Sequence, residues 1–179
     1  SSPVGLLVGR GPTADEWKWA RDVFREIAPH ARQAGVTMAL EYLNRFEHYF
    51  INDTATAARF VDEVNEHALR LHYDTFHANI EEKKIPEAIK AGGKRIAHVH
   101  ISENDRSTPG EGHVHWDETF AGLAELGYDG WLMVEAFGCA LPEIAGATCI
   151  WRNMFPNEEY LAKNGLAFMK KNVAKYWKK

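Results

Sequence analysis

The chain has 179 residues, of which 45% are hydrophobic, 12% are aromatic and 26% are charged, and its formal net charge is −4. This composition excludes a disordered chain, a collagen-like repeat and a disulfide scaffold. The negative charge gives no electrostatic reason to expect nucleic acid or an anionic membrane as a partner. No apolar run approaches the ~20 residues of a membrane span. Residues 1–5 show no secretory signal, and we therefore expect the cytoplasm as the location.

Helix and strand patterns alternate along the chain. Thr13 and Glu16 have the spacing of a capping box, which predicts the start of a helix. In chain order, the patterns predict a helix from Thr13 to Gly35, a strand over 36–40, a helix starting at Asp53 or Thr54 and reaching Val64, a strand over 69–73, a helix over 85–91, a strand over 95–99, a helix capped by Asp117 and ended by Gly127, a strand over 131–134, and helices over 142–153 and 157–177.

A polar residue follows each predicted strand: Glu41, Asp74, His100 and Glu135, at intervals of 33, 26 and 35 residues. Such intervals suit one strand–helix unit each and favour a parallel sheet in a single α/β domain over residues 1–179. Two architectures fit, a small open sheet of four parallel strands or about half of a (β/α)₈ TIM barrel. Both place ligands at the carboxyl ends of the strands, where these four residues lie.

Three carboxylates and one imidazole form a predicted metal site at this edge. Hard oxygen donors with a single nitrogen suit Mn²⁺, Co²⁺ or Mg²⁺, whereas a structural zinc site would need more Cys or His. Each acid taken alone has a simpler explanation, since strand-end carboxylates also cap helices or pair with arginine. The regular spacing of all four favours the metal site.

Five motifs then resemble one family in order along nearly the whole chain: Glu41–Glu47 (EYLNRFE), Asp74–Glu82 (DTFHANIEE), His100–Arg106 (HISENDR), Pro109–Gly112 with Trp116, and Glu135–Phe137. They resemble the D-tagatose and D-psicose 3-epimerases, which are ketose 3-epimerases of the xylose-isomerase-like superfamily.

This resemblance implies a divalent metal held by Glu41, Asp74, His100 and Glu135. It also implies that Glu41 and Glu135 act as the two acid–base groups. Glu47, His77 and Arg106 match the positions that hold the sugar. The family fold is a complete (β/α)₈ barrel, whereas this chain matches only its C-terminal part. We therefore expect either a truncated sequence or a second chain that supplies the N-terminal half-barrel, and we expect a homo-oligomer or such a complemented assembly.

The sequence also departs from the pattern of many relatives, at Tyr42, Ala136, the pair Ile101-Ser102 and the segment 141–155. These positions leave the four predicted metal ligands unchanged, so the identity of the sugar stays open.

The chemistry can be argued from the two glutamates. Removing the proton beside a ketone leaves an ene-diolate, whose charge a divalent cation stabilises. Inverting that carbon needs a base on one face and an acid on the other, which Glu41 and Glu135 could supply. Aldose–ketose isomerisation works on one face, so the pair favours an epimerase acting at C3 of a ketose.

Alternatives remain open at this point. Within the superfamily, the chain could belong to an aldose–ketose or inosose isomerase. A metal-dependent endonuclease on a related barrel would need more His and acidic ligands and a basic groove. A non-catalytic metal- or sugar-binding α/β module is the third alternative. We interpret His98 as a packed histidine. Five tryptophans are also interpreted as packing residues: Trp17, Trp19, Trp131, Trp151 and Trp177.

Overall fold

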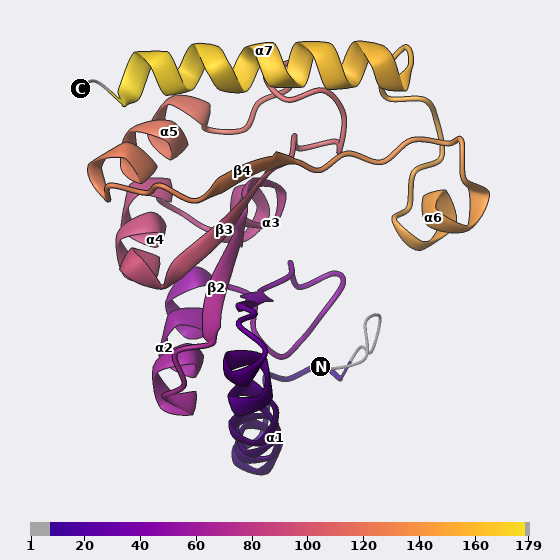
Figure 1. The fold of residues 1–179 in the computed structure, drawn as a ribbon. Coiled ribbons are helices and arrows are strands. Elements are labelled where there is room, and N and C mark those ends of the chain that lie inside the picture. Colours follow the sequence, from indigo (N-terminus) through magenta and orange to yellow (C-terminus); the bar gives the residue numbers. More distant parts are fainter. Residues whose placement is uncertain (1–7, 178–179) are drawn as a thin grey trace.

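Four strands run parallel, and their spatial order is their order in the chain. They are β1 (Met38–Glu41), β2 (Leu69–Asp74), β3 (Ile96–Ile101) and β4 (Trp131–Val134). The computed structural model describes residues 8–177 (Figure 1). Residues 1–5, where the sequence shows no secretory signal, lie outside this range. None of the helices within residues 8–177 is long and apolar enough to cross a membrane.

The helices alternate with these strands. They are α1 (Ala14–Gln33), α2 (Thr54–Val64), α3 (Thr75–Glu81), α4 (Ile85–Gly92), the 3₁₀ turn η1 (Gly93–Arg95), α5 (Trp116–Glu125), α6 (Pro142–Ala147) and α7 (Glu158–Tyr176). The predicted capping box is confirmed, because the Thr13 hydroxyl accepts from the Glu16 N–H and the Glu16 carboxylate accepts from the Thr13 N–H. Asp53 caps α2 by accepting from the Thr56 N–H.

Some predicted boundaries are wrong. β1 begins at Met38, two residues later than predicted, and α6 ends at Ala147, well before residue 153. Helix α5 begins at Trp116, with His115 as its N-cap, so Asp117 lies in the first turn and is not the cap. The Asp117 carboxylate instead accepts hydrogen bonds from Lys175 and Tyr176 on α7, so it links α5 to α7.

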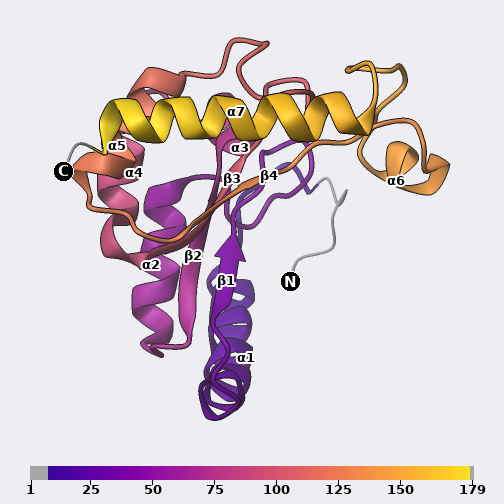
Figure 2. The same ribbon diagram turned by 45° about the horizontal axis from the view of Figure 1, so that its top comes forward.

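One face of the sheet is packed against helices. Figures 1 and 2 show α2, α4 and α5 on one side of the strands, with α7 running beyond α5 and β4. The core between these layers is apolar, and its fully buried members include Phe60, Leu69, Leu71, Tyr73, Ile89, Val99, Ile101, Phe120 and Leu123. Burial of this face stabilises the layer at roughly 25 cal/mol per Å² of apolar surface removed from water.

The opposite face carries the polar residues. Strand pairing sets Glu41 opposite His72, Asp74 opposite His100, and His98 opposite Trp131. Trp131 is 74% exposed, and Trp19 and Trp151 are also exposed, so these three tryptophans, interpreted as packing residues, are not packed within residues 8–177. A doubly wound open sheet reverses its strand order, whereas successive barrel strands keep theirs. Sequential order with one open face therefore corresponds to part of a barrel.

Candidate metal centre

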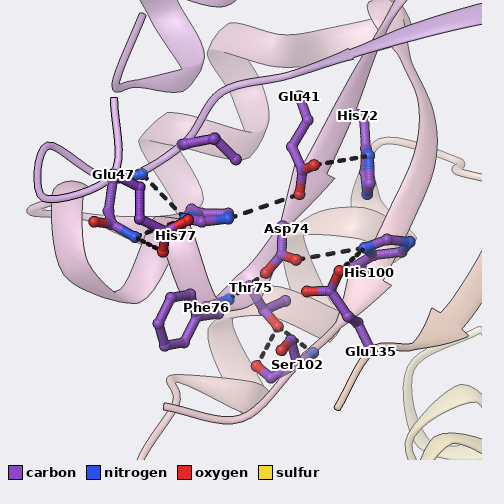
Figure 3. Close-up of polar contacts among 12 residues, drawn as sticks. Glu41, Glu47, His72, Asp74, Thr75, Phe76, His77, His100, Ser102 and Glu135 are labelled. Carbon is purple, nitrogen blue, oxygen red and sulfur yellow. Dashed lines mark hydrogen bonds and ion pairs between the residues drawn. The ribbon is translucent and has the colours of Figure 1, made fainter. Parts of the chain in front are cut away.

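The strand ends bring three predicted ligands together. One carboxylate oxygen of Glu41, one of Asp74 and a ring nitrogen of His100 all lie within 4.8 Å of one another. They come from the last residues of β1 and β2 and from the penultimate residue of β3, and parallel register holds these ends at one edge. Figure 3 shows the three side chains pointing toward a common centre.

Asp74 is fully buried and its two oxygens have different surroundings. Oδ1 accepts a 2.6 Å hydrogen bond from the Phe76 N–H and so caps α3, a helix that the sequence patterns did not predict. Oδ2 lies 3.5 Å from His100 Nδ1, and neither of these atoms has a hydrogen-bond partner among the described residues. Buried polar atoms are almost always satisfied. A divalent cation fits this oxygen-rich donor set and would satisfy both atoms.

Glu135 follows β4 directly and completes the predicted set of four. Its Oε1 lies 3.3 Å from His100 Nδ1, and its Oε2 forms an ion pair with Arg106. In Figure 3, Asp74 and His100 lie between Glu41 and Glu135. The two glutamates therefore reach the centre from the carboxyl ends of two different strands, β1 and β4.

The three predicted sugar-binding residues adjoin the same centre. Arg106 Nη2 lies 3.3 Å from His77 Nε2 and 4.0 Å from Glu47 Oε1, and His77 Nε2 lies 3.8 Å from Glu41 Oε1. His77 Nδ1 accepts a 3.0 Å hydrogen bond from the Asn44 N–H. Its Nε2 is the nitrogen that faces Arg106 and Glu41 at the centre. All seven predicted site residues thus lie in one cluster.

Arg106 owes its position to several contacts that the sequence patterns did not reveal. Its guanidinium carbon lies 3.7 Å from the ring centroid of Phe76 and 5.1 Å from that of Phe137. Its backbone is in the left-handed region, with φ of 62°. There its N–H donates to the Glu103 carbonyl, and its own carbonyl accepts from the Phe137 N–H. Phe76 and Phe137 stand inside the quoted motifs, but only the tertiary structure shows that they flank Arg106.

The charges at the centre shift one another's pKa values. Burial, followed by the charge of Asp74, raises the pKa of Glu41 to about 7. Burial also acts to raise the pKa of Asp74, but His100, His77 and Arg106 outweigh it, so that pKa lies below its usual value. Burial lowers the pKa of His77. The pKa of Glu41 thus lies near neutrality.

Known sequences resemble this chain over most of its length. The profile described as "Xylose isomerase-like TIM barrel" matches residues 3–172. An L-ribulose 3-epimerase of Mesorhizobium japonicum is 35% identical over 160 residues, which cover 88% of this chain and 54% of that protein. A D-psicose 3-epimerase of Enterocloster bolteae is 34% identical over 171 residues, covering 93% of this chain and 56% of that protein.

Solved structures resemble its fold. A structure of L-ribulose 3-epimerase superposes with a TM-score of 0.91 at 34% identity, covering 97% of this chain and 59% of that one. A D-allulose 3-epimerase from Methylomonas sp., solved in complex with D-allulose, gives a TM-score of 0.89 at 31% identity, covering 94% and 59%. The chain spans about half the length of the curated relatives that it matches.

Proposed function

This chain belongs to the family of xylose isomerase-like TIM barrels, and we propose that it carries the metal-binding and acid–base residues of a ketose 3-epimerase. The observation that carries the proposal is the convergence of Glu41, Asp74 and His100 from three strand ends, with Glu135 beside them. A fold alone does not define an activity, so the proposal depends on these side chains.

We propose that Glu41, Asp74, His100 and Glu135 hold the divalent cation. When bound, it would stabilise the negative charge that develops on the sugar oxygens during proton removal. The unsatisfied Asp74 Oδ2 and His100 Nδ1 support a cation at this point. Mn²⁺ is our first choice of ion, with Co²⁺ and Mg²⁺ as alternatives, because the donors are mainly carboxylate oxygens.

The proton transfers fall to Glu41 and Glu135 in this proposal. Deprotonation beside the ketone gives an ene-diolate, and return of a proton to the opposite face inverts C3. The imidazole of His77, the guanidinium of Arg106 and the carboxylate of Glu47 face the same centre, where they would hydrogen-bond sugar oxygens.

We further propose that residues 1–179 act as a single domain that contributes part of a barrel. Its partner would be an N-terminal half-barrel, supplied by the same or another chain, within a homo-oligomer or a complemented assembly. The open face with exposed Trp131 and the coverage of about half of each relative support this. The cytoplasmic location and the absence of nucleic-acid and membrane partners stay predictions.

The test is a proton-exchange experiment in deuterated solvent, with a catalytically complete protein and excess Mn²⁺. We expect Glu135→Gln to lose roughly 10²–10⁴-fold in epimerisation, the scale of one acid–base group. One epimer should still exchange its C3 proton through Glu41, with retention of configuration. Glu41→Gln should do the same with the other epimer.

Two results would contradict this mechanism. With bound metal verified, epimerisation by Glu135→Gln at the parent rate would show that two bases are not needed. Exchange at C1 in place of C3 would instead indicate an aldose–ketose isomerase. Glu118→Gln is the matched control, because this glutamate lies exposed on α5, away from the strand ends.

A further inference from the structure

Three histidines form a second cluster on the open face of the sheet. His98 and His100 are two residues apart on β3, so their side chains share a face, and His72 pairs directly with His98 from β2. The ring centroids lie 4.0 Å apart for His72 and His100, 4.9 Å for His72 and His98, and 5.1 Å for His98 and His100. One ring nitrogen from each histidine lies within 4.8 Å of the others.

The contacts of His72 leave a buried nitrogen without a partner. The His72 side chain is only 9% exposed, and its Nδ1 faces Glu41 Oε2 at 3.9 Å. Its Nε2 is buried and has no hydrogen-bond partner among the described residues. In Figure 3 the ring of His72 stands nearly perpendicular to the neighbouring ring of His100. A buried imidazole nitrogen that faces other imidazoles is costly unless a proton or a metal ion joins them.

We propose that His72, His98 and His100 bind a zinc ion in a second site beside the carboxylate centre. Imidazole nitrogens suit Zn²⁺ better than Mg²⁺ or Mn²⁺, which prefer oxygen ligands. Three histidines leave a fourth tetrahedral position open to water or another ligand. Zn–N bonds of ~2.1 Å require the three nitrogens, which lie within 4.8 Å of one another, to approach more closely when the ion binds.

His100 would bind in both sites at once only as an imidazolate, so binding of the second cation would release its remaining N–H proton to solvent. Nδ1 faces Asp74 Oδ2 and Glu135 Oε1, at 3.5 and 3.3 Å. Nε2 is therefore the nitrogen left for the cluster of His72 and His98. His98 belongs only to the histidine cluster, so its substitution tests the zinc site without removing a ligand of the carboxylate centre.

The test is a calorimetric titration of residues 1–179 with Zn²⁺, in buffer that contains saturating Mg²⁺ to occupy the carboxylate centre. We expect one equivalent of zinc to bind. His98→Ala should weaken this binding by more than the roughly 10- to 100-fold that loss of an outer-shell partner costs. His98→Asn repeats the test with a polar side chain, and circular dichroism verifies that each variant is folded. His113→Ala, at an exposed histidine outside the cluster, should bind zinc like the parent.

Glu41→Gln separates this proposal from the epimerase proposal. It removes a ligand of the carboxylate centre and should leave the zinc equivalent in place. Zinc binding that is lost in Glu41→Gln but unchanged in folded His98→Ala and His98→Asn would overturn the histidine site without affecting the proposed function. Absence of any zinc binding by the folded parent would overturn it as well. Zinc binding retained by Glu41→Gln and lost by His98→Ala would support it, whatever the outcome of the proton-exchange experiment.

Discussion

The guanidinium of Arg106 lies over the ring of Phe76, with its central carbon 3.7 Å from the ring centroid. Phe76 follows Asp74, a proposed metal ligand, by two positions, and its N–H donates to the Asp74 carboxylate. The short segment from Asp74 to Phe76 therefore contains both a proposed metal ligand and the ring on which the proposed sugar-binding residue Arg106 stacks. Such a stacked, partly desolvated pair is worth about 1–2 kcal/mol.

Replacement of Arg106 by Gly and by Ala separates its side chain from its backbone. Both variants remove the stacked cation, and we expect ketose affinity in a catalytically complete protein to fall at least ~10-fold in each. The left-handed backbone costs any residue with a Cβ roughly 1–2 kcal/mol, a cost that Gly avoids. Urea unfolding should therefore find Arg106→Gly more stable than Arg106→Ala by about 1 kcal/mol. Equal stabilities would contradict the argument from backbone strain.

Glu103 is expected to be a large contributor to stability. Its fully buried carboxylate accepts four N–H groups, from Asn104, Gly110, Val114 and the Trp116 ring. Glu103→Gln turns one acceptor oxygen into a donor that faces other donors. We expect a loss of about 2 kcal/mol or more in the free energy of unfolding, measured with urea. Glu125→Gln, at an exposed position of α5, is the control and should change stability by less than ~0.5 kcal/mol.

Glu41 should make the stability of the metal-free protein fall as pH rises. Its pKa is raised from 4.5 to about 7 in the folded state, so its contribution is fully present below pH 4.5 and is lost as pH rises through 7. A glutamine at this position stays neutral at every pH, so the variant does not lose stability as pH rises through 7. With a chelator present, Glu41→Gln and the parent should change little relative to each other below pH 4.5, whereas at pH 8 the variant should gain up to about 3 kcal/mol on the parent.

Addition of Mn²⁺ at pH 8 provides the control for this titration. The cation should stabilise the parent more than Glu41→Gln, because the parent offers one more charged ligand. Thermal unfolding with and without the ion measures the difference. A variant that gains as much from Mn²⁺ as the parent would argue against Glu41 as a ligand.

Residues 1–179 expressed alone should self-associate. Strands β1 and β4 are the two edges of the sheet, and unpaired edge strands promote association. Trp131 and Met133 on the open face are 74% and 48% exposed. Light scattering should find species larger than 20.3 kDa, and Trp131→Ser should reduce their amount. A monodisperse monomer that unfolds cooperatively would contradict the expectation.

The local patterns of the sequence were sufficient for most of the fold. Capping residues, apolar spacing and glycine stops predicted the four strands and most helices, because these signals act within one or two turns of chain. They failed where a distant contact decides. Asp117 has the chemistry of a cap, yet it accepts hydrogen bonds from α7, and helix α3 follows β2 without a break because Asp74 caps it.

The sequence by itself determined which residues could meet at the centre. Parallel strands present their last residues at one edge of the sheet. The positions of these four polar residues at the strand ends were therefore enough to predict that they lie close together: Glu41, Asp74, His100 and Glu135. Only the tertiary structure decided their surroundings. Burial raises the pKa of Glu41, Arg106 pairs with Glu135 and stacks on Phe76, and His72 joins the other histidines with an unpartnered nitrogen. Desolvation, ion pairing and ring contacts depend on distances between segments far apart in the chain, and no local pattern of residues encodes those distances.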